Sequence, residues 1–414
     1  MAHEHAEVVV VGGGIVGAFV AERLARAGTD VIVVDPTPGG GASFGNAGML
    51  VPSYCMPMAN PAVLADGLRA LVGGDSTIAL GRPVTRATLG WLGRFGLASR
   101  PGRARRDAGA LAALASGAVD AYAELADTEG IDIGLRRSGW LYVCGRPGAL
   151  SSQMRAARQL VDLGIRHEVL RGAELHEREP GLAGGIAGGV LYPDDASLDP
   201  AAATQAVLSS AVRHGATFHR HAILDVESAG RGIVRAVRTA AATITARAFV
   251  LAAGADSRRA GRLFGLRLPV EAGVGWSLTL PMPNGLVGQA LIGADDHIVV
   301  SPGATTVRVT GGMRIGGRAD AAADLMAVQN LRTAAERLLP PLRDLPAGTA
   351  WRGARPLTPS GLPIIGSLGR NLVVATGHGT LGMTLAPATS RAVASLLTHG
   401  TAPFPSRPRS GDPS

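Results

Sequence analysis

The sequence predicts an α/β protein in which a Rossmann-like domain with a parallel sheet is joined to a discontinuous α+β domain built on an antiparallel sheet. Three observations predict this class. A glycine-rich turn lies between two apolar runs near the N-terminus, another apolar run at 248–251 ends in small residues, and short apolar runs alternate with turns over 266–314. Small residues after an apolar strand are typical of open α/β sheets, which bind ligands at the carboxyl ends of their strands.

The glycine-rich turn lies in the segment from Glu7 to Asp35. Valines at 8–11 lead into it, and a second apolar run at 31–34 ends at Asp35. The turn reads Gly12-Gly13-Gly14-Ile15-Val16-Gly17. Strand, turn, helix, strand and terminal acid together indicate a site for the ADP half of a dinucleotide. The alternative is a glycine-rich turn in an unrelated α/β protein, and the motif does not separate FAD from NAD.

Each part of this motif has a physical role. Gly12 permits the tight turn, Gly14 lets backbone N–H groups approach a pyrophosphate, and Gly17 lets the helix pack close to the strands. The helix expected over 15–27 directs its positive N-terminus at the phosphates. Asp35 can accept hydrogen bonds from both ribose hydroxyls, and its charge disfavours the 2′-phosphate of NADP.

The composition limits the class of protein. A chain of 414 residues with 46% hydrophobic content can bury one large core or two medium ones. Two cysteines cannot form a disulfide framework, and no metal site is expected near either, so a reducing cytosol is the expected compartment. The net charge is +8, but the chain has no lysine, and its arginines are not interleaved with aromatic residues in a repeating pattern. Nucleic-acid binding is therefore not expected.

Membrane attachment is left open by one stretch. No uninterrupted apolar segment reaches the length of a bilayer span, and no secretory signal is expected before the first strand. The stretch 86–106 is apolar with arginines around it. Two interpretations remain: a helix that covers the core, or peripheral contact with the inner face of a membrane.

The remaining elements follow in chain order. A loop begins at Pro36 and stays rich in glycine to 49, which would let the main chain pass close to a flat ligand. Residues 61–178 are mostly helical in pattern, with a strand candidate at 134–143. Asp199 and Pro200 begin a helix that ends near 214. Strands are expected at 217–228, 233–238 and 248–251, and a helix over 324–339.

These elements predict an interleaved domain organisation. The dinucleotide-binding domain is expected to comprise 1–60, 180–265 and 350–400, and the second domain 61–179 and 266–349. Residues 401–414 are rich in proline, arginine and serine and are expected to form a loose tail.

A second glycine-rich loop lies near the C-terminus. After an expected strand at 372–375 the chain reads Gly377-His378-Gly379-Thr380-Leu381-Gly382 and enters a helix over 386–397. Such a loop gives a second helix N-terminus with free N–H groups. Directed at the pyrimidine end of a flavin, these groups would stabilise the charge that collects near N1 and O2 on reduction.

Five segments together resemble the D-amino-acid dehydrogenase branch of the glycine oxidase and sarcosine oxidase flavoproteins. They are Gly12–Gly17, Ser43–Gly48, Leu251–Ala255, Arg355–Pro359 and Gly377–Gly382. The resemblance implies a non-covalent FAD, because neither Cys55 nor Cys144 lies where an attachment cysteine would be expected. It also implies hydride transfer from the α-carbon of a small amino acid to flavin N5, leaving an imine that water hydrolyses. The implied substrates are D-amino acids, including D-proline-like and hydroxyproline-like amines.

The resemblance also implies which residues bind the cofactor. They are Gly12, Gly14, Ile15, Val16, Gly17, Asp35, Pro36, Ser43, Asn46, Ala47, Gly48, Ala253, Gly254, Gly379, Thr380, Leu381 and Gly382.

Four further residues are candidates for catalysis or substrate binding. Arg355 is the leading choice for a cation near the substrate or flavin, and the alternative is that it only ties down its loop. His378 is expected to pack beside the flavin rather than act as a base, because hydride transfer does not require one. Tyr54 is a cavity wall, a hydroxyl donor or ordinary core. Arg314 stands where relatives carry an acid, so it is either an added carboxylate anchor or points to solvent.

Two other functions remain open beside the dehydrogenase. One is a glycine- or sarcosine-type amine oxidase that reduces oxygen directly, and the other is the flavin subunit of a heteromeric amino-acid dehydrogenase. The electron acceptor, whether quinone, another carrier or oxygen, is undetermined at this level.

Overall fold

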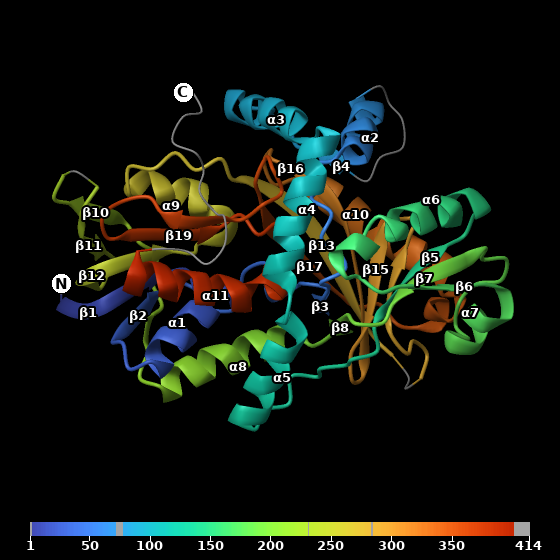
Figure 1. Cartoon of the computed structure of the whole chain (residues 1–414), viewed down its shortest axis with the longest axis horizontal. Coiled ribbons are helices and arrows are strands. Elements are labelled where there is room, and N and C mark those ends of the chain that lie inside the picture. The colour runs from blue at the N-terminus through green and yellow to red at the C-terminus, as the bar shows by residue number, and fades with distance from the viewer. Residues whose placement is uncertain (1, 72–77, 231, 283–284, 401–414) are drawn as a thin grey trace.

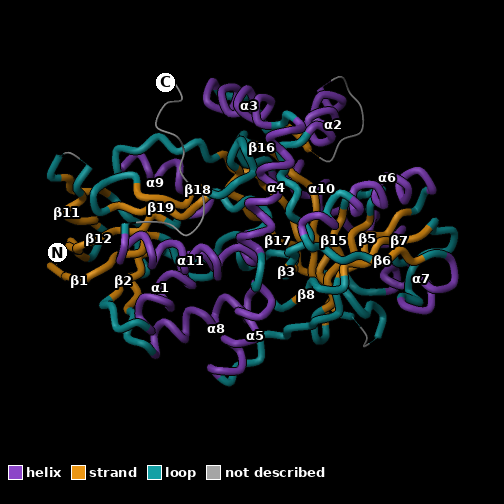
Figure 2. The backbone as a smooth tube through the Cα atoms, in the orientation of Figure 1, coloured by secondary structure: helices purple, strands orange, loops and turns teal. Residues whose placement is uncertain are grey.

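The strands of this protein form two large sheets, each with helices packed against it (Figure 1). The computed structural model describes residues 2–71, 78–230, 232–282 and 285–400. The expected tail at 401–414 lies outside the described residues. Figure 2 shows the strands in two groups, with the first sheet on the left and the second on the right of this view.

The first sheet has a parallel centre in the order β9-β2-β1-β12-β19. These strands are β1 (Ala2–Val11), β2 (Val31–Val34), β9 (Thr217–His219), β12 (Ala242–Leu251) and β19 (Leu372–Thr376). Antiparallel strands complete the sheet: β10 (Asp225–Ser228) and β11 (Val234–Arg238) beside the start of β12, and β18 (Ile364–Ser367) beside β19. The parallel order places the carboxyl ends of β1, β2, β12 and β19 at one edge.

Apolar runs hold this sheet in the interior. Alternate valines of β1 and β2 contribute to two cores, one on each face of the sheet, as expected for parallel strands covered on both sides. One face packs against α1 (Ile15–Arg26), α8 (Pro200–Arg213) and α11 (Gly382–His399), and the other against α9 (Ser257–Leu263). Asp199 caps α8 as predicted, because its Oδ1 accepts from the backbone N–H groups of Ala201 and Ala202 at 2.9 and 3.0 Å.

The second sheet has nine strands in the described part of the chain, and most of its pairs are antiparallel. The order is β17-β13-β16-β15-β14-β5-β7-β6, with β4 beside β16. The strands are β4 (Ile78–Leu80), β5 (Trp140–Cys144), β6 (Glu168–Leu170), β7 (Gly188–Tyr192), β13 (Glu271–Pro281), β14 (Ala290–Gly293), β15 (Ile298–Pro302), β16 (Thr306–Ile315) and β17 (Thr349–Leu357). Helix α10 (Ala321–Leu338) packs on one face. The predicted combination of a parallel sheet and an antiparallel sheet is confirmed.

Two strands lie in the second sheet although the expected domain boundaries assign them to the first domain. They are β7, within 180–265, and β17, which lies within 350–400 apart from its first residue, Thr349. A hydrophobic pattern identifies a strand, but the sheet that the strand joins is decided by non-local pairing, here of β7 with β5 and β6 and of β17 with β13.

The stretch from 61 to 178 is mostly helical, as predicted. Its helices are α2 (Pro61–Leu71), α3 (Arg86–Ala98), α4 (Pro101–Ala115), α5 (Ala118–Glu129), α6 (Pro147–Arg158) and α7 (Gly172–Arg178). The short strands β3 (Met49–Leu50) and β8 (Ala196–Ser197) pair with each other. None of the helices within the described residues is both long and apolar enough to cross a bilayer.

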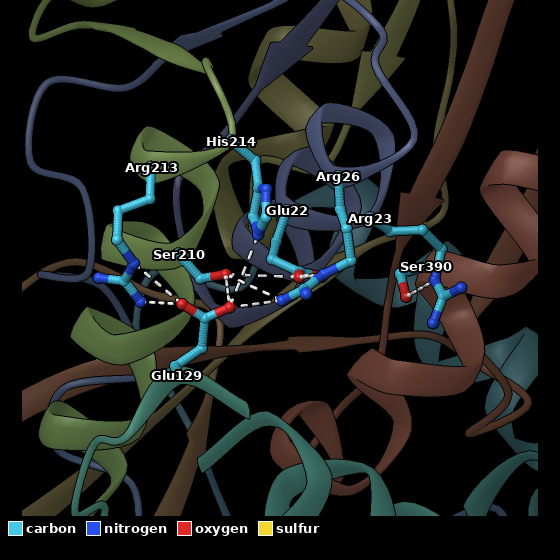
Figure 3. A network of polar contacts seen from close by, with 8 residues as sticks. All are labelled: Glu22, Arg23, Arg26, Glu129, Ser210, Arg213, His214 and Ser390. Carbon is cyan, nitrogen blue, oxygen red and sulfur yellow. Dashed lines mark hydrogen bonds and ion pairs between the residues drawn. The ribbon is translucent and has the colours of Figure 1, made fainter. Parts of the chain in front are cut away.

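A polar network fastens α5 to the first domain (Figure 3). The Glu129 carboxylate at the end of α5 accepts from Arg26 of α1 at 2.5 Å and from Arg213 of α8 at 2.9 Å. Ser210 of α8 also donates to Glu129, at 2.9 Å. Arg26 pairs in addition with Glu22 at 2.5 Å. Three helices that are distant in sequence therefore share one compensated cluster of charges.

Candidate active site

A cavity of about 570 Å³ lies between the two sheets. The carboxyl ends of β1, β2, β12 and β19 form one side, and strands β5, β13, β14, β15, β16 and β17 of the second sheet contribute the other. A volume of this size is typical of sites for small molecules and cofactors. The predicted residues Pro36, Ala47, Ala253 and Gly254 all line it.

The first glycine-rich loop occupies the β1 end of this cavity. Gly12 has φ +113°, and a Cβ there would lie 2.4 Å from the carbonyl oxygen of Ala252, so only glycine fits. Gly14 opens to the cavity and, having no side chain, contributes no cap of its own to the N-terminus of α1. Ile15 and Val16 also line the cavity. An N-terminus of this kind attracts a phosphate.

Gly17 does not line the cavity. A Cβ at this position would lie 1.9 Å from the carbonyl oxygen of Gly12, so its place is between helix and turn. The glycine therefore allows α1 to pack against the loop that would contact the phosphates.

Asp35 orders the same loop from the end of β2. Its Oδ2 accepts from the backbone N–H of Gly13 at 2.6 Å, and its Oδ1 accepts from that of Thr37 at 2.7 Å. A carboxylate has about four lone-pair sites, so both oxygens retain capacity for ribose hydroxyls. Asp35 lines the cavity at this point.

The loop at 43–48 contributes to the lining of the cavity. The Ser43 hydroxyl accepts from the backbone N–H of Ile15 at 3.0 Å, and Asn46 Oδ1 accepts from that of Gly48 at 2.8 Å. Ser43 and Asn46 line the cavity, whereas Gly48, with φ +71°, only makes the turn. Sequence reasoning missed Arg308 of β16, which donates to the carbonyl oxygen of Asn46 at 2.9 Å and so fastens this loop to the second sheet.

The second glycine-rich loop brings the N-terminus of α11 to the cavity. Gly379, Thr380, Leu381 and Gly382 all line it, and no side chain caps the helix. Tyr122 of α5 donates to the carbonyl oxygen of Met383 at 3.0 Å, which fixes the first turn. The cavity thus lies between the N-termini of α1 and α11, each with free N–H groups.

His378 lies inside this loop and is 3% exposed. Its Nε2 is 2.9 Å from the hydroxyl of Thr389. Burial lowers the pKa of the imidazole to about 4, so the ring is neutral at physiological pH. A neutral ring bonded to a threonine fits packing beside a cofactor, which is the role expected from the sequence.

Arg355 extends from β17 into the cavity. Its guanidinium lies over Gly275, where a Cβ would be only 1.9 Å from Nη1, and Nη1 donates to the carbonyl oxygen of Gly312 at 3.0 Å. No carboxylate pairs with it within the described ranges. Burial lowers the pKa of the Arg355 guanidinium, and the nearby Tyr54 opposes this shift. An unpaired cation at a partly dry wall can bind a carboxylate.

Tyr54 faces the cavity close to Arg355. The side chain is 46% exposed, but this surface is directed into the cavity, and the surrounding protein raises the pKa of its phenol. It is therefore a cavity wall and not ordinary core.

Arg314 does not occupy either of the positions expected for it. It is 8% exposed, does not line the cavity, and donates to Asp324 of α10 at 2.8 Å. Its guanidinium also lies 5.2 Å from the ring centroid of Trp276. The sequence could not show this, because the partner carboxylate comes from another element.

The lining also includes residues that were not predicted, among them Tyr142 of β5, Trp351 of β17 and His297 in the turn between β14 and β15. His297 is the one non-glycine residue with positive φ in the described ranges, at +50°. Trp351 packs on Gly45, where a Cβ would lie 1.9 Å from its ring. A strand pattern shows that alternate residues share a face but not which face meets a cavity.

The two cysteines, and one cluster of side chains of the types that bind metals, lie apart from this site. Cys55 and Cys144 are buried outside the lining, and burial raises the pKa of the Cys55 thiol to about 11. Glu22, Glu129 and His214 bring ligand atoms within 4.8 Å of one another. Arg26 and Arg213 already neutralise these carboxylates, so the cluster is an ion-pair network.

Comparison with known proteins places this geometry among flavin enzymes. Residues 7–396 match the family described as FAD dependent oxidoreductase. A D-amino acid dehydrogenase of Vibrio cholerae serotype O1 is 32% identical over 410 residues, 96% of each chain. One from Methylobacterium nodulans is 33% identical with the same coverage.

Solved structures share the whole architecture. Glycine oxidase from Geobacillus kaustophilus has a TM-score of 0.76 at 26% identity, over 97% of this chain and 96% of that one. L-proline dehydrogenase from P. horikoshii has a TM-score of 0.75 at 20% identity, with coverage of 97% and 96%, which shows a common fold.

Proposed function

The chain belongs to the FAD-dependent oxidoreductase family that its residues 7–396 match, and on this premise we propose that it oxidises the C–N bond of a small amino acid. The proposed substrates are D-amino acids and D-proline-like secondary amines. The chain's identity of 32–33% to D-amino acid dehydrogenases, over nearly the full length of both chains, supports this class of substrate.

The proposal rests on one observation, the unpaired guanidinium of Arg355. A guanidinium without a carboxylate partner among the described residues lies at the wall of a cavity flanked by two glycine-rich helix starts. A substrate carboxylate would supply the missing anion in a bidentate pair, and a partly desolvated pair of this kind is stronger than one in water.

The proposed chemistry places few demands on side chains. The α-carbon loses a hydride and the nitrogen loses a proton to solvent, which leaves an imine. Water then hydrolyses the imine of a primary amine to an oxo acid and ammonia. FAD, when bound, supplies the hydride acceptor at N5. Arg355 would hold the carboxylate, Tyr54 would limit the movement of the substrate, and the N-terminus of α11 would stabilise charge at the pyrimidine end. The neutral His378 moves no proton in this account.

The cofactor is proposed to be bound without a covalent link. Both cysteines are buried away from the cavity lining, and burial holds the Cys55 and Cys144 thiols in their protonated form. Denaturation in acid followed by centrifugation should release the yellow colour into the supernatant. Colour that stays with the precipitated protein would contradict this part of the proposal.

A substrate panel with spectral detection tests the function. The purified protein is mixed anaerobically with D- and L-isomers of alanine, proline and other small amino acids, and flavin absorbance is followed. D-isomers should bleach the flavin, and the amide of the best substrate, which lacks the carboxylate, should bleach it far more slowly. Equal rates for acid and amide would remove Arg355 from the proposal. No bleaching by any amino acid, despite bound FAD, would favour a flavin subunit that needs partner chains.

The electron acceptor is proposed to be a carrier and not oxygen, following the dehydrogenase relatives. Protein reduced by its substrate is exposed to air or to a quinone analogue, and reoxidation is timed. Faster reoxidation by the quinone is expected. Rapid reoxidation in air with peroxide release would identify an oxidase instead.

A basic face favours peripheral contact with an anionic membrane. The stretch 82–106 holds seven arginines and no acid. Within it, Leu89 and Leu97 of α3 are 57% and 58% exposed, while Trp91 and Phe95 are buried. Sedimentation with anionic vesicles should decrease in high salt and in an Arg86→Ser, Arg94→Ser variant. Equal sedimentation with neutral vesicles would contradict the contact.

A further inference from the structure

The short segment 51–54 forms a wall between two cavities. Val51 and Tyr54 line the cavity of the candidate active site, whereas Pro52 and Ser53 line a second cavity of about 740 Å³. The backbone N–H of Val51 donates to the hydroxyl of Thr384 at 3.0 Å, which holds one end of the wall on α11. The position of Tyr54 therefore depends on what holds Ser53.

A single buried carboxylate holds Ser53. Asp195, in the turn after β7, is 2% exposed. Its Oδ1 accepts from the backbone N–H of Ser53 at 3.2 Å, and its Oδ2 accepts from the Ser53 hydroxyl. The indole N–H of Trp140 on β5 donates to the same Oδ2 and also lies 3.0 Å from Ser53 Oγ, so the two acceptors share it. Three donors from two separate elements thus converge on one side chain.

Trp140 extends this contact to the tyrosines of the active-site cavity. It is 1% exposed and stacks on Tyr192 at 4.9 Å between ring centroids. The ring centroids of Tyr54 and Trp140 lie 6.3 Å apart in an edge-on arrangement, and those of Tyr142 and Trp140 lie 5.7 Å apart. Both tyrosines line the cavity, and Tyr54 is close enough to Arg355 to oppose the lowering of its pKa by burial.

We propose that Asp195 is a positioning residue, which sets the tyrosine wall of the substrate site by holding Ser53 and Trp140 together. An ionised carboxylate accepts from all three donors. A protonated one carries a hydrogen of its own, for which Ser53 Oγ is the acceptor in reach, so the hydroxyl must turn and the wall loosens. Substrate binding then depends on the protonation of a group that does not touch the substrate.

The surroundings allow Asp195 to titrate in the physiological range. Desolvation raises the pKa of its carboxyl to about 7, against the three hydrogen bonds, which lower it. The neighbouring Asp194 also raises the pKa of Asp195, although Asp194 is paired with Arg166. Burial raises the pKa of Cys55 to about 11 and that of Tyr192 to about 12, so both face Asp195 as neutral groups.

The test compares Asp195→Asn with Asp194→Asn. The first substitution keeps the shape but directs an amide N–H at the donors, and the second changes the adjacent carboxylate, which bonds Arg166 and not Ser53. Near-UV circular dichroism, which reports the packing of Trp140 on Tyr192, is measured on both sides of pH 7 without substrate. We expect a transition near pH 7 in the wild type and in Asp194→Asn, and none in Asp195→Asn.

A kinetic arm rests on the proposed function. KM for the best amino acid should fall as pH rises through about 7 in the wild type. In Asp195→Asn, KM should be about tenfold higher and should lack the change near pH 7 that the wild type shows, with kcat little changed. Since every variant meets the same substrate, titration of the substrate amine cancels in the comparison.

The outcomes separate the two proposals. A dichroism transition near pH 7 that persists in Asp195→Asn, or an unchanged KM profile in that variant, would overturn the role of Asp195. If no amino acid is oxidised, the proposed function fails, while the dichroism still decides whether Asp195 controls the aromatic cluster. Ser53→Ala replaces Asp195→Asn if the latter does not fold, because it removes the hydroxyl and leaves the carboxylate. Ser53→Ala should shift the pH of the dichroism transition, and a transition at the wild-type pH would count against the proposal.

Discussion

Two glycines determine where Arg355 can act. Gly275 leaves room for the guanidinium, and the carbonyl oxygen of Gly312 accepts one of its hydrogen bonds. A side chain at 275 would displace the cation, because a Cβ there would overlap Nη1. The charge is therefore held by backbone groups alone, which leaves its other N–H groups for an anion.

Replacement of Arg355 should weaken substrate binding more than it slows turnover. In Arg355→Ala we expect KM to rise about a hundredfold, because the carboxylate loses a partly buried charged partner. Arg355→Lys should recover part of this loss, since an ammonium keeps the charge but not the two parallel hydrogen bonds. Steady-state kinetics with Arg370→Ala, an exposed arginine, provides the control. A pure loss of kcat in Arg355→Ala would place this residue at the flavin instead.

His378 should affect acid stability more than catalysis. Its pKa of about 4 in the folded protein is below the ordinary 6.5, so the unfolded chain binds the extra proton. Stability from the neutral ring is present above pH 6.5 and is lost as pH falls towards 4. His378→Asn should reduce this acid sensitivity in thermal unfolding and change the rate of flavin bleaching only about threefold. A loss of several orders of magnitude in that rate would restore the general-base interpretation.

At the scale of elements, the ends of α1, α5 and α8 meet at Glu129 (Figure 3). Helix α5 then reaches the active site through Tyr122, which bonds the first turn of α11. A cluster remote from the cavity thus supports the helix start that would face the cofactor.

Loss of the Glu129 charge should loosen this junction. The pKa of Glu129 is lowered to about 2, compared with an ordinary 4.5, and the largest cause is its hydrogen bonding to Arg213. The stabilisation is present above pH 4.5 and is lost as pH falls through about 2. Glu129→Gln should lower the free energy of unfolding by about 2 kcal/mol at neutral pH, a value reduced by the solvent exposure of both arginines.

Thermal unfolding of this variant at neutral and acid pH checks the prediction. The difference from the wild type should shrink in acid, as both proteins approach an uncharged residue 129. Glu124→Gln, on the exposed side of α5, is the matched control and should be neutral. An equal effect of the two substitutions would mean that the cluster contributes little.

At the scale of the whole molecule, the cavity lies between two sheets that share part of one core, because Trp140 and Tyr192 of the second sheet belong to the same buried cluster as Val8 and Val10 of the first. Arg308 crosses from the second sheet to the loop at 43–48, and Arg258 of α9 pairs with Glu271 of β13 at 2.7 Å. A ligand in this cavity would contact both sheets and so couple their stabilities.

Removal of FAD should therefore destabilise the entire protein. We expect the apoprotein to unfold at a lower temperature, and a thousandfold excess of FAD over its Kd to restore about 4 kcal/mol. Calorimetry with FAD, NAD and NADP compares the nucleotides. Stabilisation by NAD equal to that by FAD would contradict the assignment of the cofactor. If two unfolding transitions appear and FAD raises the temperature of only one, the two sheets unfold independently.

Local sequence patterns were sufficient for much of the fold. The turn at 12–17, the cap at Asp199 and the valine runs of β1 and β2 could be predicted because glycine, a capping carboxylate and apolar periodicity act over a few residues. The segments that carry the family resemblance also line the cavity.

By itself, then, the sequence determined the elements, the two glycine-rich helix starts and the class of cofactor they suit. Only the tertiary structure decided which strands join which sheet. It also decided that Arg314 pairs with Asp324, while Arg355 has no carboxylate partner among the described residues. The position of Asp195 behind Tyr54 likewise became visible only in the folded chain. The reason is physical. Propensity and periodicity are local, whereas the partner of a charge and the face of a strand are fixed by contacts between residues far apart in the chain.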